Sequence, residues 1–147
     1  MNKIEIFEQY LEKSESIMLF EKFVENGTGY YKSCFKNKLG EFNYFVLIHP
    51  TPVVEVICNV LKITGDKAKS IVLEYINELN IRTKGIKYLL DRNGNVEVCY
   101  EFIGTEEDFN PEDVLGTALA YFNTIERDVA QLVVVLEKEK NKEENFN

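Results

Sequence analysis

The stretch YLLDRNGNVEVCYEF, Tyr88 to Phe102, holds two apolar runs on either side of a polar centre. Apolar and polar residues alternate in each run, which is typical of half-buried strands. Asn93-Gly94 is a strong hairpin signal, because both residues tolerate the positive φ values of a two-residue turn. The centre is also rich in oxygen ligands, but Gly94 is fourth from Asp91, whereas a calcium loop needs glycine sixth. The stretch therefore predicts a β-hairpin and not a calcium site.

Three strands are predicted upstream of this hairpin, at Tyr30–Lys36, Phe42–His49 and Val53–Leu61. β-Branched and aromatic residues dominate all three segments, as is typical of strands. Their short connections predict an antiparallel meander. A helix is predicted from Asp66 to Leu79, because its apolar residues share one helical face, with Asn80 as a left-handed cap.

Two further helices are predicted near the ends of the chain. The apolar residues of segment 1–26 recur at spacings of three, four and seven, and Gly27 offers a stop to that helix. Asn110-Pro111 is a helix start, since Asn accepts hydrogen bonds from first-turn amides and Pro fits the first helical position. From there the apolar pattern continues to about Leu136.

Together these elements give the order αβββαββα, an α+β fold in which helices pack on an antiparallel sheet. A chain of 147 residues favours one domain, which we place at residues 1–137. The polar segment 138–147 is expected to be a flexible tail.

Composition narrows the classes of partner and compartment. The formal net charge of −8 at pH 7 disfavours binding to nucleic acid and to anionic membranes. Cys34, Cys58 and Cys99 lie far apart in apolar runs, which favours buried thiols in a reducing compartment. The sequence shows neither a signal-peptide pattern nor an apolar run of the roughly 20 residues that span a membrane. We therefore expect a cytoplasmic protein.

The sequence offers little for catalysis. His49 is the only histidine, which excludes a histidine-rich metal site, and its place beside Pro50 favours a strand-end residue over a catalytic base. Glu97 and Glu101 share one face of a predicted strand, but paired carboxylates do acid–base chemistry when burial separates their pKa values. There is no glycine-rich phosphate loop. We expect no enzyme, no cofactor and no metal.

The surface of the sheet is the remaining candidate for function. Two predicted strands carry apolar side chains on both faces, although an antiparallel sheet needs only one apolar face. Phe45 and Leu47 oppose the main apolar set of one strand, and Val53 and Ile57 oppose that of the next. Either helices cover both faces, or the second face meets another protein. These four are therefore the predicted partner-binding residues.

The run from Leu61 to Gly104 resembles the YbjN-like family, also called bacterial sensory transduction regulators. The resemblance is carried by Leu79-Asn80 at a helix end, by the D-x-x-G-x-V turn of Asp91, Gly94 and Val96, and by the long closing helix. It implies a fold similar to that of type III secretion chaperones, which are commonly homodimers that bind extended segments of other proteins. It implies no catalytic residues.

We therefore expect a non-enzymatic regulatory or chaperone-like domain that acts as a homodimer and engages a protein partner through a sheet face or a helix groove. Two alternatives stay open. One is a small-molecule binder or enzyme with a dispersed carboxylate site, and the other is an acidic inhibitor or immunity-type protein that docks on a basic target.

Overall fold

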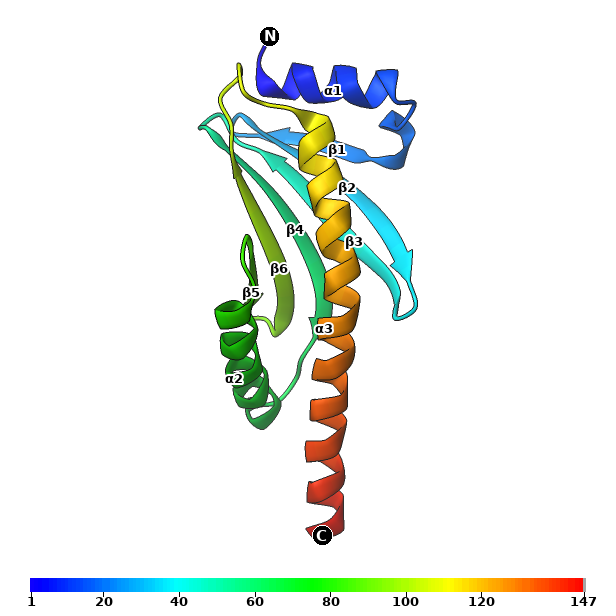
Figure 1. The fold of residues 1–147 in the computed structure, drawn as a ribbon, viewed down its shortest axis with the longest axis vertical. Coiled ribbons are helices and arrows are strands. Elements are labelled where there is room, and N and C mark those ends of the chain that lie inside the picture. The colour runs from blue at the N-terminus through cyan, green and yellow to red at the C-terminus, as the bar shows by residue number, and fades with distance from the viewer. Residues whose placement is uncertain (147) are drawn as a thin grey trace.

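The structure, a computed structural model, describes residues 1–146 and confirms an α+β fold built on one six-stranded sheet (Figure 1). The helices are α1 (Lys3–Lys13), α2 (Asp66–Arg82) and α3 (Pro111–Phe146), with a short 3₁₀ helix at Ile17–Leu19. The strands are β1 (Glu21–Glu25), β2 (Thr28–Asn37), β3 (Gly40–Ile48), β4 (Val53–Lys62), β5 (Ile86–Leu90) and β6 (Asn95–Ile103). Their order across the sheet is β1-β2-β3-β4-β6-β5, and all neighbours are antiparallel.

The predicted single helix over residues 1–26 is wrong. α1 ends just before Ser14, whose hydroxyl donates back to the Tyr10 carbonyl at 2.8 Å, and Glu15 adopts a positive φ of 57°. The chain then forms β1, and Asn26-Gly27 closes a hairpin to β2 with φ values of 51° and 79°. Two positive values match the type I′ turn that Asn-Gly favours. The dipeptide interpreted as a helix stop is therefore the turn that adds a sixth strand.

The β5–β6 hairpin lies where the sequence predicts it, but its turn is of another type. Asn93 does not take a positive φ, whereas Gly94 does, at 86°. The Gly94 amide donates to the Asp91 carbonyl at 3.2 Å, and the Asp91 amide donates to the Asn95 carbonyl at 2.9 Å. This pattern is a turn followed by a left-handed glycine bulge. The glycine is thus needed for the reason predicted, and the asparagine is not.

Gly94 also fixes the hairpin against the chain that leads into α2. The Ile63 amide donates to the Gly94 carbonyl at 2.7 Å. A Cβ atom at position 94 would overlap the Ile63 carbonyl oxygen, so only glycine allows the two backbones to lie this close.

α2 continues past its predicted end at Leu79, so Asn80 is not its cap. The Asn80 side chain instead bonds both backbone groups of Tyr88. Its Nδ2 donates to the Tyr88 carbonyl at 3.0 Å, and the Tyr88 amide donates to its Oδ1 at 2.8 Å. The amide side chain takes the place of a neighbouring strand at the outer edge of β5.

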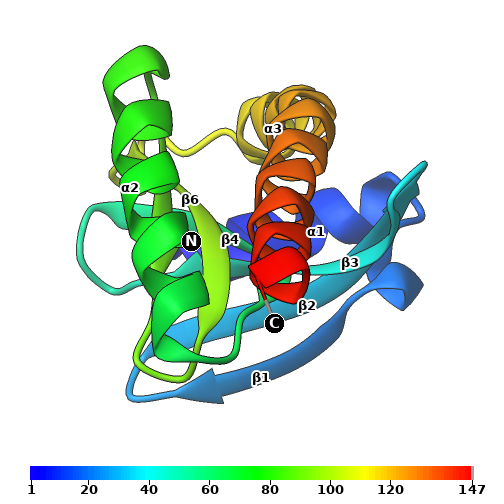
Figure 2. The same cartoon turned by 90° about the horizontal axis from the view of Figure 1, so that it is seen from below.

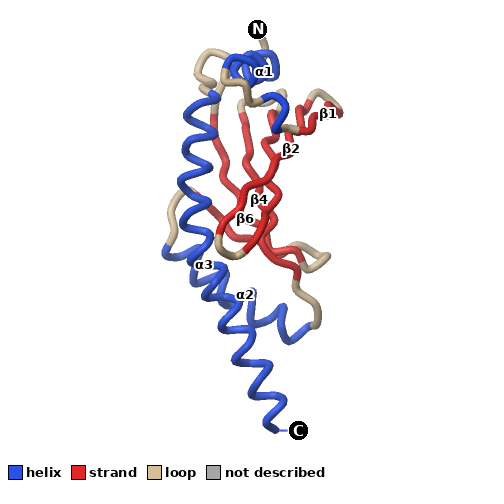
Figure 3. Tube along the Cα trace, turned by 90° about the vertical axis from the view of Figure 1, so that its right-hand side faces the viewer, coloured by secondary structure: helices blue, strands red, loops and turns tan. Residues whose placement is uncertain are grey.

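All three helices lie on the same side of the sheet (Figures 2 and 3). Alternate strand residues point toward them and are buried, for example Val46 on β3 and Val54 on β4, which pack in one core with Val114 of α3. α3 crosses the sheet and extends beyond it (Figure 1). The segment 138–147 is helical as far as Phe146, residue 147 lies outside the described residues, and the predicted flexibility of this segment stays a prediction.

Candidate functional site

The sheet has a second face that none of the three helices covers (Figure 2). We call it the open face. Its residues are those that alternate with the buried ones: Glu21, Phe23, Glu25, Tyr30, Lys32, Cys34, Lys36, Glu41, Asn43, Phe45, Leu47, His49, Val53, Glu55, Ile57, Asn59, Lys62, Asn95, Glu97, Cys99, Glu101, Ile103, Lys87 and Leu89. The sequence left open whether this face is covered, and within the described residues it is not.

The four predicted partner-binding residues all lie on the open face. Phe45 and Ile57 are direct cross-strand partners at its centre, and Leu47 neighbours them on β3. Val53 lies toward one end, opposite the exposed Ile103. All four predicted residues are half-buried, because neighbouring side chains cover their flanks while their tips face outward. The structure thus gathers them into one apolar strip.

The inner strands of the open face carry charges of opposite sign, and each edge strand carries a counter-charge, Glu21 on β1 beside Lys32 and Lys87 on β5 beside Cys99. β2 contributes Lys32, whereas β4 and β6 contribute Glu55, Glu97 and Glu101. Burial, and secondarily Asp91, raises the pKa of the Glu97 carboxyl. The sequence indicated Glu97 and Glu101 as a pair, but we did not predict Lys32 of β2 on the same face, across β3 and β4 from them. Combining strand alternation with the antiparallel register would have placed all of these charges on one face.

The thiols on and under this face are not activated. Burial raises the pKa of Cys99 to about 11 and that of Cys58 to about 12. A thiol with so high a pKa stays protonated near neutral pH and is a poor nucleophile. Cys34 is exposed, and a hydrogen bond with Glu41 raises the pKa of its thiol. The cysteines therefore give no sign of covalent chemistry.

His49 stands in a series of hydroxyl, imidazole and carboxylate groups that the sequence did not predict. Its Nδ1 lies 3.3 Å from the Thr28 hydroxyl, and its Nε2 lies 2.9 Å from a Glu55 oxygen. The order resembles nucleophile, base and orienting acid. Thr28 is only 8% exposed, however, which leaves a substrate little access to its hydroxyl. The series instead ties the ends of β2, β3 and β4 together.

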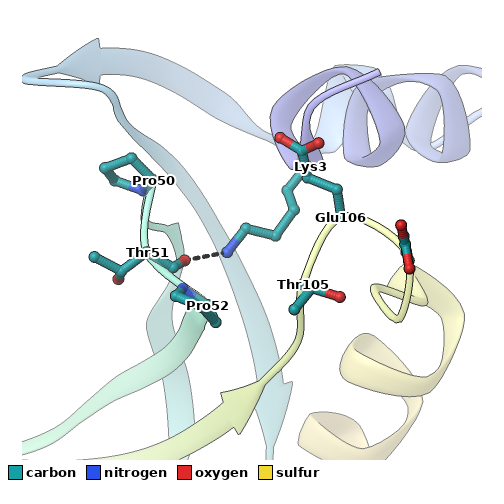
Figure 4. Close-up of a pocket in the computed structure, with 7 residues that line it drawn as sticks. Lys3, Pro50, Thr51, Pro52, Thr105 and Glu106 are labelled. Carbon is teal, nitrogen blue, oxygen red and sulfur yellow. Dashed lines mark hydrogen bonds between the residues drawn. The ribbon is translucent and has the colours of Figure 1, made fainter.

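Lys3 is buried beside a hollow of about 420 Å³ between the β3–β4 turn and the β6–α3 loop (Figure 4). Its Nζ donates to the Thr51 carbonyl at 2.5 Å and to the Val53 carbonyl at 3.4 Å. Burial lowers the pKa of this amine. Because backbone carbonyls already bind the amine, it fastens α1 to the β3–β4 turn and is not free for a ligand.

A second hollow of about 290 Å³ separates α2 from the part of α3 that extends past the sheet. Ala68 and Ile71 line one wall and Leu136 the other, and an ion pair between Lys67 and Glu143 spans the top. This is the helix groove of the structure. Lysines of both helices and glutamates of α3 stand at its rim.

Asp128 is a buried carboxylate in the apolar stripe of α3. It is 3% exposed, and the Tyr88 hydroxyl donates to its Oδ2 at 2.7 Å. Burial, together with this hydrogen bond, raises the pKa of Tyr88. The sequence signal was present, because Asp128 lies three residues after Ile125 and four before Leu132 on the buried face of the helix. The hydrogen bond between Tyr88 and Asp128 fixes the position of α3 against β5.

The described residues contain no group of three or more His, Cys, Asp or Glu side chains placed to bind a metal ion. Over the same residues, no helix is long and apolar enough to cross a membrane. No protein-family model and no curated protein sequence matches the chain. The resemblance to the YbjN-like family, and the likeness to type III secretion chaperones that it implies, therefore remain predictions.

Proposed function

We propose that this chain is a non-enzymatic protein-binding domain whose docking surface is the open face of its sheet. The observation that carries the proposal is the apolar strip of Phe45, Leu47, Val53 and Ile57, which the helices leave uncovered. The four side chains are half-buried, and Glu55 lies among them, opposite Leu47. Apolar side chains that gather on a face which no other element covers are typical of protein-interaction sites.

The border of the strip also fits protein docking. Tyr30 stacks on Phe23 with ring centroids 4.5 Å apart and an interplanar angle of 2°. Aromatic side chains are enriched at protein interfaces because they bury a large area at low conformational cost. Charged residues stand farther out, where a partner's charges set orientation more than affinity.

The resemblance to YbjN-like proteins supports a regulatory or chaperone-like domain that acts as a homodimer. In that case the open face and the helix groove are two separate surfaces, one for contact between the two copies and one for contact with the protein partner. The groove between α2 and α3 has a rim of mixed charge, with Lys62, Lys67 and Lys140 beside Glu139 and Glu143.

The test is capture of host proteins by the immobilised full chain. Ile57→Lys places a charge at the centre of the open face, and we expect it to release the captured proteins. Leu73→Lys is the matched control, because Leu73 is 54% exposed on α2, away from this face. Equal capture by wild type and Ile57→Lys, with both folded by circular dichroism and both monomeric at the concentration used, would contradict the proposal.

One observation favours a second candidate, an acidic inhibitor that docks on a basic target. Glu55, Glu97 and Glu101 lie together on the open face without a lysine or arginine in ion-pair contact among the described residues. An acidic docking surface makes association steeply salt-dependent. Capture that survives 1 M salt, at a Debye length of about 3 Å, would exclude this candidate and leave apolar docking.

A further inference from the structure

The register of the sheet arranges the open face in straight rows. The central row reads, from β1 to β5, Glu21, Lys32, Phe45, Ile57, Cys99 and Lys87. The next row reads Phe23, Tyr30, Leu47, Glu55 and Glu101. β2, which carries Lys32, lies beside β3, and β6, which carries Glu97 and Glu101, lies beside β4. These two strands therefore flank the apolar centre at equal distances.

The negative side is only partly compensated in the single chain, because Lys87 on β5 lies opposite Cys99, between Glu97 and Glu101, but forms no ion pair with either among the described residues. Glu55 and Glu101 lie directly opposite each other on β4 and β6, and like charges in such a pair repel. Glu55 has His49 as a partner, whereas Glu101 forms no ion pair with any described residue. A cation from outside the chain would relieve this repulsion.

Given that the open face docks on a protein, as proposed above, we propose that this protein is a second copy of the chain. The two sheets pack face to face about a two-fold axis that runs parallel to the strands, between β3 and β4. This axis lays β2 of one copy across β6 of the other, and β1 across β5. Face-to-face sheets with nearly aligned strands are a common packing arrangement.

The central row is self-complementary about this axis. Phe45 meets the partner's Ile57, and the symmetry gives the reverse contact as well. Lys32 lies above the partner's Cys99, between the partner's Glu97 and the partner's Glu101. The face is hollowed at that place by about 390 Å³, and Cys99 and Glu101 line the hollow. A lysine side chain from β2 thus enters a cavity whose wall holds Glu101 and also Lys87, and Lys87 itself lies across the axis from the partner's Glu21.

The charge pattern also rejects the other face-to-face symmetry. A two-fold axis perpendicular to the strands would lay every strand across its own copy, whatever the offset along the strands. Lysines of β2 would then face lysines, and glutamates of β6 would face glutamates. Like-charge contacts across an interface oppose association. Only the parallel axis brings opposite signs together.

The area suffices for a stable dimer. β2, β3, β4 and β6 contain nine or ten residues each. At about 4.8 Å between strands and 3.3 Å per residue, these four strands cover roughly 570 Å² per copy, or roughly 1,100 Å² for the pair. A specific interface needs about 1,000 Å².

The decisive variant is Glu101→Lys, measured by sedimentation equilibrium of the full chain. Wild type is expected to be a dimer at micromolar concentration. The variant removes the repulsion between Glu101 and Glu55 inside the chain, so its melting temperature should hold or rise at a protein concentration low enough that both proteins are monomers. It also sets lysine against the partner's Lys32 twice per dimer, so the dissociation constant should rise about tenfold. A general loss of fold cannot produce this combination.

Charge reversal of both members completes the test. Lys32→Glu alone should weaken the dimer about as much as Glu101→Lys does, and the double variant should recover wild-type association within about threefold. Glu78→Lys on α2 makes the same charge change away from the face and should leave the dimer unchanged. This control shows how much the dissociation constant changes when the net charge of −8 becomes less negative.

The outcomes separate this inference from the proposed function. A chain that stays monomeric at 100 μM, while Ile57→Lys still abolishes capture of host proteins, overturns the second copy as occupant and leaves the proposed function standing. A dimer that Glu101→Lys does not weaken, or that the double variant does not restore, overturns the parallel axis. A monomer whose capture of host proteins ignores Ile57→Lys overturns both proposals.

Discussion

Gly94→Ala tests the contact that fixes the β5–β6 hairpin to the rest of the fold. Gly94 has a φ of 86°, and an alanine there costs about 1–2 kcal/mol because its Cβ opposes the left-handed conformation. The added Cβ also overlaps the Ile63 carbonyl oxygen, so the two backbones must separate. Separation breaks the 2.7 Å bond from the Ile63 amide, and leaving a buried amide unpaired costs about 1–3 kcal/mol.

The two costs sum to about 2–5 kcal/mol of unfolding free energy. At roughly 4 °C per kcal/mol for a chain of this size, the melting temperature should fall by about 8–20 °C. Differential scanning calorimetry gives the shift, and urea titration gives the free energy at 25 °C.

Gly27→Ala is the matched control for this prediction. Gly27 has a similar φ of 79°, but a Cβ there would meet only the Pro50 side chain at an ordinary 3.6 Å. Its cost should be the conformational part alone, about 1–2 kcal/mol. Equal losses from the two glycine variants would refute the reasoning, because the Ile63 contact would then contribute nothing.

Three further changes probe the polar contacts of the same region. Asn80→Ala removes both hydrogen bonds to the Tyr88 backbone and should cost about 1–3 kcal/mol in urea titration, whereas Asn77→Ala on the same helix should cost nothing. Tyr88 has a raised pKa, so its contribution to stability is complete below the unfolded value of about 10 and is lost as pH rises past it. Tyr88→Phe should therefore flatten the fall of the urea midpoint above about pH 10. The pKa of Asp91 is lowered, first by the hydrogen bond from the Asn95 side chain, so its contribution is present above the unfolded value of about 3.9 and is lost as pH falls through the folded value. Asp91→Asn should flatten the acid limb of the stability curve, and an unchanged limb would contradict the assignment.

The elements predicted correctly from the sequence are those whose signals are local. The helix from Asp66 and the helix from Pro111 each carry an apolar stripe, and the second also carries its start signal, Asn110-Pro111, whose asparagine accepts from the Glu112 amide. β2 to β4 are joined by short turns, so their antiparallel order follows from chain length alone. Long-range information was not needed for any of these.

The prediction of a single helix before Asn26 was wrong because two local interpretations fit the segment equally well. Ile17, Met18 and Val24 occur at helical spacing, and Asn-Gly serves both as a helix stop and as a hairpin turn. The choice is made by strand pairing across the Asn26-Gly27 turn, since Phe23 stacks on Tyr30 and β1 pairs along β2. Strand pairing overrode the helical periodicity.

The open face could be predicted as apolar but not as uncovered. The sequence around Phe45 and Ile57 does not indicate on which side of the sheet the three helices lie. That side is set by contacts remote in sequence, such as Lys3 with the Thr51 carbonyl and Tyr88 with Asp128. Such contacts join residues 48 and 40 positions apart, beyond the reach of any periodicity.

The turn at Gly94 links the fold to the proposed interface. The turn folds β6 back beside β5, and the bond between Gly94 and Ile63 holds the start of β6 beside the end of β4. β6 then carries Glu101 to the same distance from the apolar centre as Lys32 on the other side. A face with one sign on both flanks would repel a second copy in every orientation, whereas this face repels it in one and attracts it in the other. A loosened turn should therefore weaken association as well as stability, and Gly94→Ala should raise the dissociation constant of the dimer more than Gly27→Ala does.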